Sequence, residues 1–134
     1  MNTKNLKKQL SERLKTVEDA YKETGRPKID FSFYPEDLRV NREAEYNVIV
    51  LIEAARKIEI ENGSDEKLDW TDYSQWKWIP WFRISASGFA FAFTDFDYSR
   101  AFAGSGSRLR VLSKITCEYL GETFLDIWEK VQLF

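Results

Sequence analysis

Basic and aromatic side chains recur in the C-terminal half of the chain at positions that could bind nucleic acid. The candidate binding residues are Lys77, Trp81, Arg83, Arg108 and Arg110. In proteins that bind single strands, aromatic rings stack on bases while lysine and arginine neutralise phosphates. Trp81 would stack and the four basic residues would contact phosphate. The competing interpretation is that these charges are only solvated, or are covered by acidic residues such as Glu53 or Glu59.

A pair of carboxylates suggests a second kind of chemistry. Asp95 and Asp97 are separated by one residue, and carboxylates of this kind bind Mg²⁺ in enzymes that process phosphoesters. Arg108 could assist such a reaction. The sequence identifies no third ligand, however, and aspartates at the end of a strand commonly form turns or caps. Asp95 and Asp97 are therefore weak candidates for a metal site.

The residue types that are missing restrict the chemistry further. The chain of 134 residues has no histidine and one cysteine, which removes the commonest general base and any zinc site built from cysteine and histidine. Cys117 has no histidine to activate it, so we expect a small buried residue there. We expect no cofactor and no enzymatic activity.

Length and charge indicate the setting in which the chain works. The length predicts a single domain, residues 1–134. The net charge of −2 gives no bulk attraction to nucleic acid or anionic lipid. The start of the chain is polar, the longest apolar run is too short to span a bilayer, and a lone cysteine forms no internal disulfide. We expect a soluble, cytoplasmic protein without a membrane partner.

Apolar periodicity predicts the elements that must position these residues. We expect one helix over residues 3–23, a second over 42–61 capped by Asn41, and a closing helix after Ser113. Strands are predicted at 76–84, 88–96 and 108–112. The order α-α-β-β-β-α predicts an α+β fold in which a three-stranded antiparallel sheet packs with about three helices.

Side chains alternate between the two faces of a strand, so position along each strand predicts the core. The predicted core face comprises Trp76, Trp78, Phe82, Ile84, Phe89, Phe91, Phe93, Leu109 and Val111. The opposite face would then carry the candidate binding residues around the small Ala90 and Ala92. Pro80 leaves two possibilities open, because proline is confined to an edge strand or a bulge. A bulge at that position would exchange the faces of Trp81 and Phe82.

Several short motifs follow one another in the C-terminal half: W-K-x-x-P-W-F, S-G-F, G-S-R-L and Y-x-G-x-x-F. With the preceding Asp-Trp they occupy Asp69, Trp70, Trp76, Lys77, Pro80, Trp81, Phe82, Ser87, Gly88, Phe89, Gly106, Ser107, Arg108, Leu109, Tyr119, Gly121 and Phe124. This set resembles a family of short uncharacterised proteins encoded in prophages and mobile elements of gut Bacteroidetes. The chain departs from the family at residues 110–113, where R-V-L-S replaces C-F-K-S. The resemblance implies a mobile-element context and no particular chemistry.

Together these observations predict a non-enzymatic accessory protein of a prophage or mobile element that binds a macromolecular partner. A protein partner or a second copy is favoured over nucleic acid, because the chain is slightly acidic. One alternative is a binder of single-stranded nucleic acid that uses the five candidate binding residues. The other is a metal-dependent, phosphoester-processing enzyme that uses Asp95 and Asp97.

Overall fold

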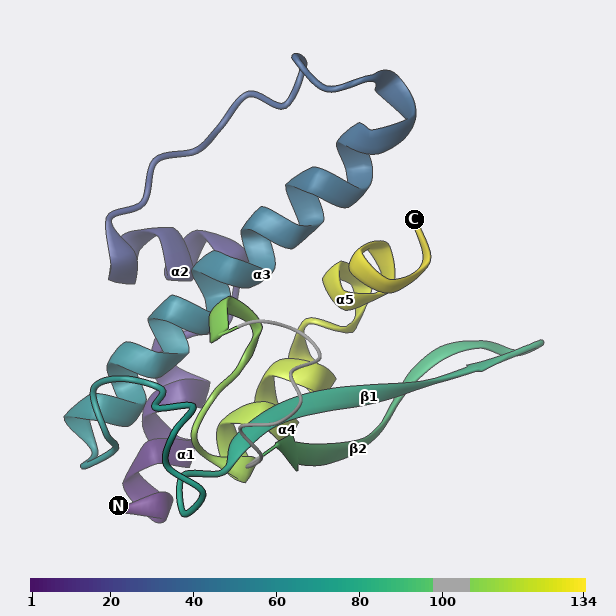
Figure 1. Cartoon of the computed structure of the whole chain (residues 1–134). Helices are drawn as coiled ribbons and strands as arrows, with labels where there is room; N and C mark the ends of the chain where they lie inside the picture. Colours follow the sequence, from purple (N-terminus) through teal and green to yellow (C-terminus); the bar gives the residue numbers. More distant parts are fainter. Residues whose placement is uncertain (98–106) are drawn as a thin grey trace.

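The chain folds into helices packed around one long helix, and a β-hairpin extends away from them (Figure 1). The computed structural model describes residues 1–97 and 107–134, except for the side chains of residues 97 and 107. The helices are α1 (Thr3–Arg13), α2 (Val17–Thr24), α3 (Glu36–Glu61), α4 (Lys114–Thr123) and α5 (Leu125–Leu133). A 3₁₀ turn, η1, covers Ser107–Leu109, and the strands are β1 (Lys77–Ser85) and β2 (Gly88–Asp97). The predicted α+β class is confirmed, but the prediction of three strands and about three helices is wrong.

The helix predicted over residues 3–23 is two helices, α1 and α2. The Thr16 hydroxyl accepts a hydrogen bond from the Asp19 N–H at 3.2 Å, and the Asp19 carboxylate accepts one from the Thr16 N–H at 3.0 Å. This capping box satisfies amide groups that the start of a helix otherwise leaves unpaired. A new helix therefore begins after Thr16. Leu14 and Ala20 are both buried, so the apolar pattern continues across the break.

The long helix α3 begins six residues earlier than Arg42, the predicted start. Glu36 and Asp37 occupy its first turn, where negative charge is favourable because the amide end of the helix is electropositive. Asn41, predicted as the cap, lies inside the helix. Its side-chain amide donates to the Val131 carbonyl at 3.1 Å and so connects α3 to α5.

The predicted closing helix is also divided, at Phe124. Phe124 has a backbone φ of −111° and ψ of 35°, outside the helical region, and it both ends α4 and precedes α5. Phe124 and Trp128 are buried. The Trp128 ring lies 5.6 Å from the Phe82 ring of β1. The change of direction at Phe124 thus places the aromatic side chain of α5 against the hairpin.

The predicted third strand is reduced to a single bridge between Trp78 and Val111. Trp78 and Val111 exchange two backbone hydrogen bonds, of 2.8 and 3.2 Å. In an antiparallel pair the next bonded positions would join Leu109 to Pro80 and Ser113 to Trp76. Pro80 has no N–H to donate, and Ser113 is already the cap of α4. Pairing along this edge of β1 therefore stops after one bridge.

The core lies between α3 and the other helices, with part of one hairpin face packed against it. Its fully buried apolar side chains come mainly from α1, α3 and α4 and include Leu6, Leu10, Val48, Leu51, Ala55, Ile58 and Cys117. Trp78, Phe82 and Phe89 of the hairpin pack on this cluster. Among the described residues, none of the helices has the length and apolar character needed to cross a membrane.

Candidate functional site

A β-bulge in β2 decides which aromatic side chains of the hairpin face solvent. Trp81 pairs with Phe93 and Phe82 pairs with Phe91, so Ala92 is an extra residue without a partner in β1. The bulge therefore lies in β2, opposite the step from Trp81 to Phe82, and β1 keeps the predicted alternation. Phe93, predicted to be in the core, is moved to the opposite face.

The outer hairpin face, defined here as Ile79, Trp81, Arg83, Phe93 and Asp95, lies away from the helices. Trp81 and Phe93 are 52% and 55% exposed. Their rings stack with a centroid separation of 6.1 Å and an interplanar angle of 10°. Two large aromatic side chains that cover each other only in part form an apolar surface bordered by one positive and one negative side chain.

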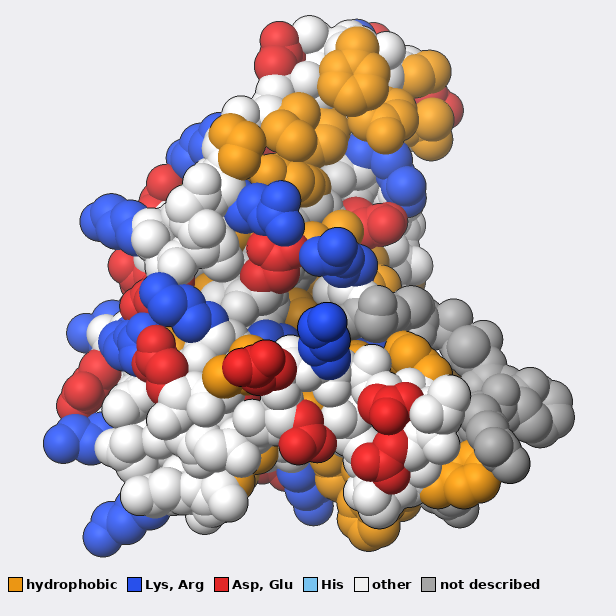
Figure 2. Space-filling view, turned by 60° about the vertical axis from the view of Figure 1, so that its left-hand side comes forward, with side chains coloured by type: hydrophobic (Ala, Val, Ile, Leu, Met, Phe, Trp, Pro, Cys, Tyr) orange, Lys and Arg blue, Asp and Glu red, His pale blue; other side chains and the backbone are white. Residues whose placement is uncertain are grey.

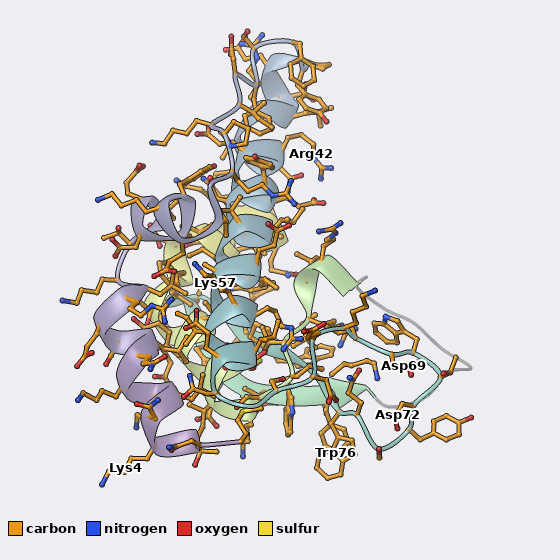
Figure 3. All side chains as sticks on the ribbon, turned by 90° about the vertical axis from the view of Figure 1, so that its left-hand side faces the viewer. Lys4, Arg42, Lys57, Asp69, Asp72 and Trp76 are labelled. Atoms are coloured by element: carbon orange, nitrogen blue, oxygen red, sulfur yellow. The ribbon has the colours of Figure 1, made fainter. Side chains whose placement is uncertain are left out.

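Lys77 lies on the predicted face but does not belong to an open surface, because only 1% of it is exposed. The loop before β1 covers it. The Lys77 ammonium donates to the Gln75 carbonyl at 2.7 Å and lies 5.2 Å from the centre of the Trp70 ring. These contacts compensate for burial of the charge. Figure 3 shows this loop through the side chains of Asp69, Asp72 and Trp76.

Hydrogen bonds within the loop hold it over Lys77. The buried Gln75 side chain accepts from the Asp69 N–H at 2.6 Å and donates to the Lys67 carbonyl at 2.9 Å. The Asp69 carboxylate accepts from the Thr71 hydroxyl and N–H, and these bonds lower the Asp69 pKa. Lys77 therefore organises a loop; it is not available to contact phosphate.

The two arginines that follow residues 98–106 add no open positive charge to the outer hairpin face. Arg108 is exposed and pairs with the Glu53 carboxylate at 2.9 Å, and Arg26 binds the same carboxylate at 2.8 Å. Arg110 is buried, with 4% exposure. Glu53 of the acidic helix thus pairs with Arg108 without covering it, because the Arg108 side chain stays 67% exposed. Of the five candidate binding residues, only Trp81 and Arg83 share an exposed surface.

Glu59 is a second acidic residue of α3 that faces this region, and it is completely buried. One carboxylate oxygen accepts from the Arg56 guanidinium at 2.8 Å and from the Leu112 N–H at 3.1 Å. The buried Thr116 hydroxyl interacts with this carboxylate and lowers its pKa, although neither the hydroxyl nor the second carboxylate oxygen makes a hydrogen bond of normal geometry among the described residues. Burial raises the pKa of Glu59, and the Arg56 charge opposes that rise. The carboxylate connects α3 to the segment before α4.

The structure describes only part of Asp95 and Asp97, the possible metal-binding pair. Asp95 is exposed, and its carboxylate accepts a hydrogen bond from the Phe96 N–H at 2.8 Å. The side chain of Asp97 lies outside the described residues. Within the described part of the chain, no group of three or more histidine, cysteine, aspartate or glutamate residues is arranged to hold a metal ion. Burial raises the pKa of the Cys117 thiol, which disfavours its nucleophilic form.

The surface along α3 is dominated by alternating charges (Figure 2). Glu23 accepts from Arg13 at 2.8 Å and from Lys57 at 3.1 Å, and the Arg13 hydrogen bond lowers the Glu23 pKa to about 2. A shallow cavity of about 580 Å³ lies beside this network and is lined by both acidic and basic side chains of α3. Because this surface carries both positive and negative side chains, its charge does not favour one class of ligand.

A second exposed apolar region lies at the opposite end of the molecule from the loop before β1. Figure 2 shows hydrophobic side chains gathered where the segment before α3 meets the start of that helix. The exposed residues there include Ile29, Phe33, Leu38 and Val40. This region adjoins a cluster in which the rings of Phe33 and Tyr34 lie 4.5 Å apart.

Several residues of the C-terminal motifs contact one another. Gly121 of α4 lies against Pro80 of β1 and Phe91 of β2, so closely that an added Cβ would be 3.2 Å from a carbon of each. Trp70 covers Lys77, and the Phe82 ring stacks on Phe89 at 4.7 Å. These contacts dock the hairpin on α4 and secure the preceding loop. Some of the motif residues thus build the fold, whereas Trp76, Trp81 and Arg108 of the same set are exposed.

Comparison with known proteins found no matching family model, no matching curated protein and no matching solved structure.

Proposed function

We propose that the protein is a non-enzymatic, cytoplasmic accessory protein of a prophage or mobile element, and that it binds a protein partner through the outer hairpin face. The observation that carries the proposal is the exposed stack of Trp81 and Phe93 on the hairpin. Tryptophan and arginine are enriched among the residues that dominate protein interfaces. Arg83 borders the stack and can supply a charged contact at its rim.

Charge distribution favours a protein over a nucleic acid as this partner. Arg83 and Asp95 place one positive and one negative side chain on the outer hairpin face. Lys77 and Arg110 are buried, and Arg108 pairs with Glu53. Binding to nucleic acid depends on several cations that neutralise adjacent phosphates. An aromatic surface without that cluster is better suited to an apolar protein surface.

The mobile-element context rests on the motif resemblance. Several of the matching residues contact each other across the hairpin, α4 and the loop before β1. Trp81 belongs both to the motif set and to the outer hairpin face, so the motifs include part of the proposed binding surface.

A photo-crosslinking amino acid at position 93 tests the proposal in the native host. We expect a covalent adduct with a discrete protein, and we expect its loss when Trp81→Ala is combined with the probe. The matched control carries the same probe at Phe33, which is exposed on the other apolar region. Recovery of nucleic acid from position 93, or the same adduct from both positions, contradicts the proposal.

An equilibrium titration separates the two partner classes. Fluorescence anisotropy with labelled single-stranded oligonucleotides at low salt should show no saturable binding, because the outer hairpin face has no cluster of cations. Saturable binding that Arg83→Ala weakens and salt reverses would favour the nucleic-acid alternative instead.

A further inference from the structure

The cavity of about 580 Å³ beside α3 has an apolar floor. Its lining includes Ile52 and Ile60 of α3 and Leu68 of the loop before β1. Figure 3 shows Lys57 on the stretch of α3 that forms one wall. Small-molecule sites are typically concavities of about 300–1,000 Å³ with apolar walls and a few polar groups. The cavity therefore has the size and the floor to hold the apolar part of a small molecule.

The loop that forms the opposite wall is held in place by hydrogen bonds. The Gln75 side-chain amide donates to the Lys67 carbonyl at 2.9 Å and to the Asp65 carboxylate at 3.0 Å. From α3, the Arg56 guanidinium donates to the Ser64 hydroxyl at 3.0 Å and to the Asp65 carbonyl. These bonds fix the loop relative to α3, so a ligand would not have to order this wall when it binds.

The charged side chains around the cavity differ in whether they already have a partner. Arg56, Lys57 and Glu61 each bind an opposite charge that does not line the cavity, at distances of 2.5–3.1 Å. These three side chains are engaged in contacts within the fold. The charge that a ligand would meet is therefore set by the remaining residues of the rim.

Two cations of the rim are available to a ligand. The Lys67 ammonium makes no hydrogen bond or ion pair within the described residues, and the two acidic residues that precede it do not line the cavity. Arg108 is exposed and donates one N–H to Glu53 at 2.9 Å. Arg26 already binds both oxygens of Glu53, at 2.8 and 2.9 Å. Arg108 can therefore turn to a ligand without leaving Glu53 unpaired.

We propose that this cavity binds a small carboxylate with an apolar body, of the medium-chain fatty acid type. The hydrocarbon chain lies on the floor, and the carboxylate accepts hydrogen bonds from Lys67 and Arg108. Such bonds between charged groups are about twice as strong as neutral ones, and the arginine fork matches two carboxylate oxygens. The cavity shares no residue with the outer hairpin face, so the inference does not rest on the proposed function.

Isothermal titration calorimetry of the full chain with decanoate, at low ionic strength, tests the inference. We expect saturable binding at one site that added salt weakens. Decan-1-ol has the same chain without the charge, and it should bind about tenfold more weakly or less, because its hydroxyl gains no charge-assisted hydrogen bond. Decyltrimethylammonium, which carries the opposite charge, should bind more weakly still.

Substitutions locate the binding site. Lys67→Gln and Arg108→Gln should each weaken decanoate binding about tenfold and leave decan-1-ol binding unchanged. Leu68→Trp fills the floor and should abolish binding of both compounds. Lys4→Gln, at an exposed lysine of α1 (Figure 3), is the matched control and should have no effect. Trp81→Ala should also leave decanoate binding unchanged.

Four outcomes would overturn the inference. These are no saturable binding of decanoate, equal affinity for decanoate and decan-1-ol, decanoate binding that both glutamine variants leave intact, and loss of binding in Trp81→Ala, which would place the fatty acid on the exposed aromatic stack. The Lys67 and Arg108 side chains are exposed, so their variants keep the test decisive even if Leu68→Trp fails to fold. Absence of a crosslinked protein at position 93 would contradict the proposed function and leave these results unaffected.

Discussion

Gly121→Ala probes how closely α4 approaches the hairpin. The added methyl carbon would lie 3.2 Å from the Pro80 Cβ and 3.2 Å from the Phe91 Cδ2. Carbon atoms pack best about 3.5–4.0 Å apart, so both neighbours must retreat by several tenths of an ångström. Pro80 is a rigid, buried ring in the paired strand, which restricts that retreat.

Two opposing contributions set the size of the effect. Alanine is better than glycine within a helix by about 1 kcal/mol, which favours the variant. Overpacking of a close contact typically costs about 1–3 kcal/mol. Because two neighbours from different strands are crowded at once, we expect the cost to exceed the gain. The free energy of unfolding should fall by about 1 kcal/mol, and the melting temperature by about 4 °C.

Urea denaturation followed by tryptophan fluorescence measures this difference, since the chain has five tryptophans. Glu122→Ala and Glu122→Gly form the matched control, because that neighbouring position is exposed and reports helix propensity without crowding. In a Phe91→Leu background the loss caused by Gly121→Ala should shrink. A Gly121→Ala variant as stable as the wild type, or more stable, would refute the reasoning.

Two further substitutions test other parts of the fold. Thr16→Ala removes one half of the capping box that starts α2. It should lower the free energy of unfolding by about 1 kcal/mol in the same denaturation assay. Lys15→Ala, one residue earlier, serves as the control. Glu59→Gln tests the buried carboxylate, whose pKa is raised in the folded state. Between the unfolded and the folded pKa, the folded wild type holds a proton that the unfolded chain releases. The contribution of Glu59 to stability is therefore fully present below the unfolded pKa of about 4.3, and it is lost as pH rises through the folded pKa. Wild-type stability minus Glu59→Gln stability should therefore decrease from pH 4 upward, and a difference that is constant or increases with pH would contradict the assignment.

Sequence patterns predicted the element types well because apolar periodicity reflects burial directly. The alternation in β1 placed Trp78 and Phe82 inward and Trp81 outward, as the structure has them. It was wrong for Trp76 and Ile84, which were predicted to lie in the core and are exposed. The bulge at Ala92 could not be predicted from alternation. Its extra residue moves the neighbouring side chains to the other face of the strand, while the order of apolar residues in the sequence stays the same. Phe93 was consequently placed in the core, whereas it completes the exposed stack.

Helix boundaries were the other source of error, and local hydrogen bonds explain them. The capping box of Thr16 and Asp19 divides the apolar stripe into two helices, and this signal was missed because the stripe continues across it. The break at Phe124 has no comparable signal, since it depends on how Trp128 packs against the hairpin. Burial of Lys77 is likewise tertiary, because a separate loop covers it.

The position of Pro80 limits how far the sheet can polymerise. Its nitrogen lies on the β1 edge that already carries the Val111 bridge, so a further strand laid there would miss a hydrogen bond. A fibre of stacked hairpins needs two open edges on every subunit, one for each neighbour. With the β1 edge interrupted by proline, hairpins cannot add to one another in series. The proline thus protects the hairpin against edge-to-edge aggregation.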